Sequence, residues 1–107
     1  MSKATQLTRG LRRRLMYVEN KDGLIYGANA RVAWVSFSRI GRTVYYRGRE
    51  FGRSNGVSGN FMDVSTREEY WISGVKKRGS NAHWAESGIK VLIDADATEE
   101  YRNRTTA

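Results

Sequence analysis

Three consecutive cations between two glycines are the first feature of this sequence that could do chemistry. Lys76, Lys77 and Arg78 follow an alternating, strand-like segment directly. Backbone amides freed by glycine, with cations beside them, suit the binding of a phosphate or another anion. The segment is not a P-loop, because Ser80 follows the second glycine without an intervening lysine. An anion site and a solvated hairpin loop are both open interpretations of it.

The only histidine of the chain is the other group that could act in catalysis. His83 is followed by Trp84 and Glu86, with serines nearby, so the components of a triad are present. A triad is defined by spatial roles, however, and one histidine is normally a packing or hydrogen-bonding residue. One imidazole without any thiolate is also a poor basis for a zinc site. We therefore expect no catalytic residue, no metal and no cofactor, and keep His83 and Trp84 as candidate surface residues.

Arginine dominates the charge of the first half of the chain. The 19 Lys and Arg residues exceed the 11 Asp and Glu residues, which gives a net charge of +8, and residues 1–14 hold five bases and no acid. The forked guanidinium group suits phosphate and can stack on bases. The candidate nucleic-acid-binding residues are therefore Arg12, Arg13, Arg14, Arg31, Arg42, Arg47, Lys76, Lys77 and Arg78. Residues 1–14 are predicted to form a flexible basic arm, for a polyanion or as a solvated tail.

Aromatic residues lie close to many of these arginines. Stacking of bases on tyrosine or tryptophan beside phosphate-binding arginines would suit single-stranded nucleic acid. In so small a domain most rings belong to the core. Tyr45 or Tyr46 is the best candidate for exposure, because adjacent strand residues face opposite sides of a sheet.

Short alternating segments separated by glycine-bearing turns predict a β-rich fold. The predicted strands are 15–19, 30–38, 43–47, 61–64, 69–75 and 89–93. The glycine-rich residues 51–59 and the polar residues 76–88 are predicted to be loops. Asp96 and Glu99 have capping-box spacing, so a helix is predicted from Ala97 to about Arg104. A partial match of this segment to a calcium loop lacks the required glycine and final glutamate.

This pattern predicts an all-β or β-rich α+β fold: a small, strongly bent antiparallel sheet or partly open barrel, with one short C-terminal helix. Residues 15–107 are expected to form a single domain, since 107 residues with 39% apolar content suffice for one modest core. The chain has no cysteine and no apolar run long enough to span a membrane. These features favour a cytoplasmic protein without a disulfide framework or a membrane partner.

The run from Glu69 to Lys77, followed by Gly79, His83 and Trp84, resembles a family of small uncharacterised bacterial proteins of about this length. The spacing of Ser38, Gly41, Thr43, Tyr45 and Gly48 also matches, so the resemblance covers residues 15–104. It implies one domain and no known activity. Some relatives carry the label of a deoxyxylulose phosphate synthase, a large thiamine-diphosphate enzyme for which this chain is too short. Relatives often begin near Leu15, and many have a basic residue in place of Ala82.

Two functions of different classes follow most directly from these observations, and a small-ligand or catalytic protein is a third hypothesis. The first is non-specific binding of RNA or single-stranded DNA, or another polyanion, through phosphate contacts. The alternative is a protein-interaction or structural module without a nucleic-acid role. Salt distinguishes the two, because phosphate contacts weaken steeply with ionic strength and an edge-strand peptide site changes little.

Overall fold

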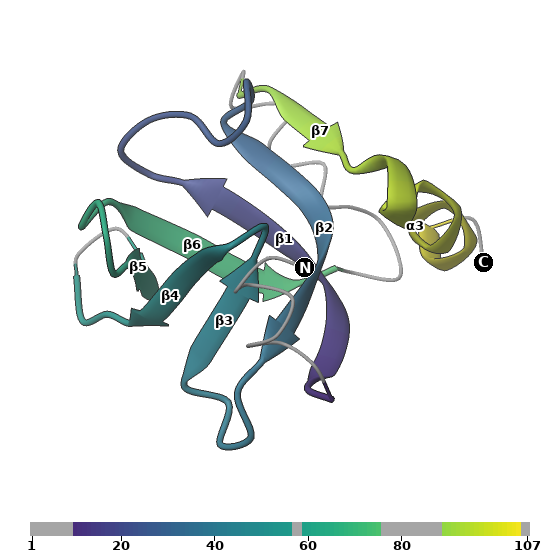
Figure 1. Cartoon of the computed structure of the whole chain (residues 1–107). Helices are drawn as coiled ribbons and strands as arrows, with labels where there is room; N and C mark the ends of the chain where they lie inside the picture. The colour runs from purple at the N-terminus through teal and green to yellow at the C-terminus, as the bar shows by residue number, and fades with distance from the viewer. Residues whose placement is uncertain (1–9, 57–58, 76–88, 106–107) are drawn as a thin grey trace.

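Six strands follow one another around a closed antiparallel barrel in the computed structural model, which describes residues 10–56, 59–75 and 89–105 (Figure 1). Each strand pairs with the next, and the sixth returns to pair with the first. The strands are β1 (Arg12–Asn20), β2 (Ala30–Phe37), β3 (Thr43–Tyr46), β4 (Arg49–Arg53), β5 (Phe61–Asp63) and β6 (Glu69–Gly74). The predicted small, bent antiparallel architecture is confirmed, and the barrel is closed.

One edge of β2 pairs with two different strands along its length. Ser36 and Phe37 of β2 pair with β3, whereas residues 30–32 pair in parallel with β7 (Val91–Ile93). A 3-10 turn η1 (Ala95–Ala97) and the short helix α3 (Thr98–Thr105) follow β7 at the upper right of Figure 1. The C-terminal segment, from β7 to α3, therefore lies outside the barrel and packs against β2.

Two apolar clusters hold these parts together. The barrel interior is filled by side chains from all six strands and Ile25: Val18, Ile25, Ala33, Val35, Val44, Tyr46, Phe51, Phe61, Tyr70 and Ile72. A second cluster, in which Leu15 and Val32 meet Ala97, lies on the outer face of β1 and β2, with Trp34 and Tyr101 packed against it. Strand β2 is apolar on both faces because each face meets a different cluster.

Three local predictions differ from the structure. Strand β1 begins at Arg12, so the arginines at 12–14 belong to the barrel, whereas the flexible arm was predicted to extend to residue 14. Residues 49–53 form β4, although the glycines of 51–59 predicted a loop. The helix has no capping box: Asp94 is the N-cap of η1, without a side-chain capping hydrogen bond, and Asp96 lies within that turn.

Glycine positions account for the missed strand and for one turn that was predicted correctly. Gly52 lies within β4, and a Cβ there would make only ordinary contact with Val64, at 3.7 Å. A Cβ on Gly59 would lie 2.5 Å from the carbonyl oxygen of Tyr70, so only glycine fits where the chain approaches β6. Gly41, in the glycine-bearing turn between β2 and β3, has a φ of 74°, a conformation that glycine adopts readily.

No helix within the described ranges is both long enough and apolar enough to cross a bilayer. The predicted loop 76–88, with Lys76, Lys77, Arg78, His83 and Trp84, lies outside the described residues.

Candidate functional site

The two ends of the barrel differ in whether their arginines are paired with acidic side chains. We call one the closed end; it is marked by Asn20, Arg31, Tyr46, Arg49, Asp63 and Tyr70, at the ends or starts of their strands. The other, the open end, contains the start of β1, the β2–β3 hairpin and the last residue of β4. The start of β1 and this hairpin lie side by side at the bottom of Figure 1.

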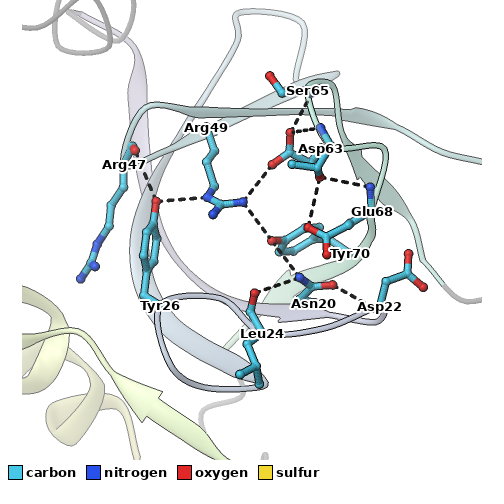
Figure 2. A network of polar contacts seen from close by, with 11 residues as sticks. Asn20, Asp22, Leu24, Tyr26, Arg47, Arg49, Asp63, Ser65, Glu68 and Tyr70 are labelled. Atoms are coloured by element: carbon cyan, nitrogen blue, oxygen red, sulfur yellow. Dashed lines mark hydrogen bonds and ion pairs between the residues drawn. The ribbon is translucent and has the colours of Figure 1, made fainter.

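A hydrogen-bonded network covers the closed end, with Arg49 at its centre (Figure 2). Arg49 Nη1 lies 3.1 Å from Asp63 Oδ2 and 3.4 Å from the Tyr70 hydroxyl, and its Nε donates to the Tyr26 hydroxyl. Asn20 Nδ2 also donates to the Tyr70 hydroxyl. Burial is the main cause that raises the pKa of Tyr70 to about 12. The positive charge of Arg49 is therefore neutralised by Asp63 within the fold.

Asp94 completes the closed end from outside the barrel. Its carboxylate, buried to 4% exposure, accepts a 2.6 Å hydrogen bond from the Tyr46 hydroxyl. Arg31 Nη1 lies 3.3 Å from one oxygen and Arg47 Nη2 lies 3.2 Å from the other. Burial first, and then the bond to Asp94, raises the pKa of Tyr46. One carboxylate thus joins β2, the end of β3 and the β3–β4 turn.

These contacts correct part of the sequence-predicted site. Tyr46 was a candidate for the surface, but its side chain is only 3% exposed and belongs to the core. Tyr45, its neighbour, is half-buried and faces the other side of β3. Arg31 and Arg47 were candidate phosphate ligands, yet both are ion-paired with Asp94. The sequence did not reveal this, because Asp94 is 63 residues from Arg31.

The open end holds a cleft of about 580 Å³ that we call the open-end cleft. Its lining, as far as the described residues go, combines four arginines with the apolar Phe37 and Ile40 and contains no acidic residue: Gly10, Leu11, Arg12, Arg14, Phe37, Ser38, Arg39, Ile40, Gly41 and Arg53. None of its four arginines forms an ion pair with an acid among the described residues. Within the part of the chain that the structure describes, the cleft is therefore a cationic cavity without an internal counter-charge.

Strand register explains why these arginines converge. Arg14 pairs with Val35, Arg12 with Phe37 and Arg53 with Phe61. Directly paired residues lie on the same face of a sheet, and these partners belong to or pack against the barrel core, so the arginines lie on the interior face. Strands β1 and β4 stand on opposite sides of the six-strand ring. The guanidinium groups of these arginines therefore approach the opening of the cleft from two sides of the barrel.

Local contacts position the two remaining parts of the cleft. The Ser38 hydroxyl accepts a hydrogen bond from the Thr43 amide, and the Gly41 amide donates to the Ser38 carbonyl, which fixes the hairpin that carries Arg39. The Arg53 guanidinium lies 4.9 Å from the centre of the Phe61 ring, a cation–π distance. Preset geometry of this kind reduces the entropy lost when an arginine binds an anion.

A second cleft lies on the other side of the start of β1, and we call it the edge cleft. It measures about 540 Å³ and is lined by Arg12, Arg13, Arg14, Leu15, Met16, Trp34, Gly74, Val75 and Arg104. Strand β6 pairs with β1 only from Met16 onward, which leaves residues 12–15 of β1 beyond the end of β6. Arg12 and Arg14 line both clefts, so the two basic surfaces are continuous.

The structure separates the other predicted arginines. Arg13 lies on the outer face of β1, with its guanidinium 5.2 Å from the Trp34 ring and 3.9 Å from Asp96. Arg42 is exposed at the end of the β2–β3 connection. Sequence reasoning omitted Arg39 and Arg53 from the site. The signal for Arg53 was its position two residues after Phe51, which becomes informative once 49–53 is recognised as a strand.

No group of three or more metal-ligating side chains occurs within residues 10–56, 59–75 and 89–105. Comparisons with protein-family models, with curated proteins and with solved structures found no match. The described geometry is therefore the basis for assigning a function, and the resemblance to small bacterial proteins stays a prediction.

Proposed function

We propose that this protein binds single-stranded nucleic acid, RNA or DNA, through phosphate contacts at the open end of the barrel. The observation that carries the proposal is the convergence of Arg12, Arg14, Arg39 and Arg53 on one cleft whose described lining residues include no acid. Like charges gathered in this way repel each other, and a bound polyanion relieves that repulsion.

Continuity of the two clefts favours a strand over a small ion. Arg12 and Arg14 line both cavities, and the edge cleft adds Arg13 and the indole of Trp34, together with Arg104, whose guanidinium is ion-paired with Glu100. A cationic track beside an aromatic ring is the arrangement that single-strand-binding proteins use for backbone and bases. No base-reading motif accompanies it, so we expect weak sequence selectivity.

Salt-dependent binding tests the proposal. Anisotropy of a labelled mixed-sequence oligonucleotide should show binding at about 50 mM salt that weakens as salt rises. The double change Arg39→Gln and Arg53→Gln should lower the affinity and reduce the slope of log K against log salt by about 1.4, since each single-strand phosphate contact contributes about 0.7.

The matched control removes two exposed cations near the closed end, Arg67→Gln and Lys90→Gln. It makes the same change in net charge and should leave the slope close to that of the wild type. Equal losses in both double variants would assign binding to net charge alone and contradict a site at the open end. Absence of salt-sensitive binding by the wild type would leave the protein-interaction module as the better explanation.

A further inference from the structure

We infer that the open-end cleft holds the terminal phosphate of a nucleic-acid strand, a phosphomonoester, while the strand itself continues along the edge cleft. This inference rests on the proposed function and specifies which part of the ligand each cleft takes.

The cleft is closed toward the interior of the barrel. Phe37 lines it and packs against the core cluster, whose Val35, Val44 and Phe51 are buried. An anion can therefore enter the mouth, but a polymer cannot pass through the barrel. A strand that follows the edge cleft into this cavity cannot continue into the barrel, which suits the end of a chain.

The arrangement of charge also favours a compact, doubly charged group. Arg12 and Arg14 approach from β1, Arg53 from the opposite strand β4, and Arg39 from the hairpin. A phosphomonoester carries close to two negative charges at neutral pH and presents three equivalent oxygens, whereas an internal phosphodiester carries one charge. Several guanidinium forks that line one cavity match the former.

The volume of the cavity leaves room for more than the phosphate. At about 580 Å³ it falls within the size range of small-molecule sites, and Phe37 and Ile40 provide apolar surface beside the arginines. Ile40 is 79% exposed at the hairpin tip. The sugar or base of the terminal nucleotide would contact these side chains, and the next nucleotides would leave through the side shared with the edge cleft.

Four oligonucleotides of one sequence, about 12 nucleotides long, test this inference. They carry a 5′ phosphate, a 3′ phosphate, hydroxyls at both ends, or no ends because the strand is circular. We expect at least one phosphorylated form to bind about tenfold or more tightly than the hydroxyl form, the ratio that one charge-assisted hydrogen bond supplies. A hydroxyl-ended strand one nucleotide longer controls for added charge. The circular strand should bind no better than the hydroxyl form.

Two adjacent arginines on opposite faces of β1 provide matched variants. Arg14→Gln should abolish the preference for the terminal phosphate, because Arg14 lines the open-end cleft, and it should also weaken all the strands, because Arg14 lines the edge cleft as well. Arg13→Gln should weaken all the strands but keep the preference, because Arg13 lines the edge cleft and not the open-end cleft. Circular dichroism of each variant verifies that the barrel is folded.

The ionisation of the ligand gives an independent readout. The second pKa of a phosphomonoester is about 6, and arginine keeps its charge throughout. The preference should therefore be full at about pH 7.5 and shrink at about pH 5. Equal binding of all four oligonucleotides would refute this inference and leave the proposed function intact. Absence of binding by any of them would refute both.

Discussion

The stability of the closed end depends on the carboxylate of Asp94. It receives the Tyr46 hydroxyl and two guanidinium groups, at distances from 2.6 to 3.3 Å. Arg31 Nε is buried without a hydrogen-bond partner in the described structure, so this arginine depends all the more on its remaining contacts. Removing the charge of Asp94 would leave two cations at the closed end without their counter-ion.

Asp94→Asn should accordingly destabilise the protein by about 3 kcal/mol, and Tyr46→Phe by about 1.5 to 3 kcal/mol, the range for a hydrogen bond to a charged group. Urea unfolding of each variant measures these changes. Asp96→Asn is the control, since the side chain of Asp96 is 67% exposed and should matter by less than about 0.5 kcal/mol. Equal effects at residues 94 and 96 would contradict the role assigned to Asp94.

Three buried tyrosines with raised pKa values, Tyr17, Tyr46 and Tyr70, predict a loss of stability in alkali. The pKa of Tyr70 is about 12 in the folded protein against 10.0 for an ordinary tyrosine, and that of Tyr46 is also raised. The unfolded chain therefore binds fewer protons above pH 10, so the stability is fully present below pH 10 and falls as the pH rises through 12. Tyr70→Phe should flatten this fall in a pH series of urea unfolding. A variant as steep as the wild type would contradict the assignment.

At the scale of elements, the segment η1–α3 protects the outer face of β1 and β2. Ala97 is fully buried against Leu15 and Val32, whereas Ala95 in the same turn is exposed. Ala97→Asp should cost about 3 to 5 kcal/mol, because it places an unpaired charge in an apolar cluster. Ala95→Asp makes the same change of residue in water and should be close to neutral. Chemical unfolding of both variants, followed by tryptophan fluorescence, tests the contrast.

Alternation in the sequence predicted most elements of the barrel, because residues of one strand face enter the same core. The pattern of residues 69–75 places Tyr70 and Ile72 on one face, and both are buried. It failed for β4, where Gly52 interrupts a strand without being required by its surroundings. Local patterns do not report such tolerance, and they also do not define where a strand such as β1 begins when arginines replace apolar residues.

The candidate site was predictable only in its chemistry. An excess of arginine in the first half indicated anion binding, and Arg12 and Arg14 do line the open-end cleft. Which arginines are neutralised depends on acids that are distant in the sequence. Asp63 forms an ion pair with Arg49, and Asp94 forms ion pairs with Arg31 and Arg47. Spacing along a chain contains no information about such pairings.

For the whole molecule, the unequal ends predict a specific response to phosphate. Inorganic phosphate at about 20 mM should raise the melting temperature more than chloride of equal ionic strength, because a ligand of the folded state stabilises it by mass action. The Arg39→Gln, Arg53→Gln variant should lose this difference, while the Arg67→Gln, Lys90→Gln variant keeps it. Differential scanning fluorimetry is sufficient. An equal response in the two variants would indicate general salt effects on the protein surface.

The divided edge of β2 has a consequence for how the chain acquires its structure. Along one edge of β2 the paired strand changes from β3 to β7. The hydrogen bond between the side chains of Tyr46, at the end of β3, and Asp94, directly after β7, connects these two strands although the residues are 48 positions apart. During synthesis the six barrel strands emerge before this carboxylate does, so the nascent barrel has an unsealed side until residue 94 leaves the ribosome. Folding measured with a chain released before residue 94 should therefore stop at a looser barrel, and the last step of folding should be the docking of the C-terminal segment.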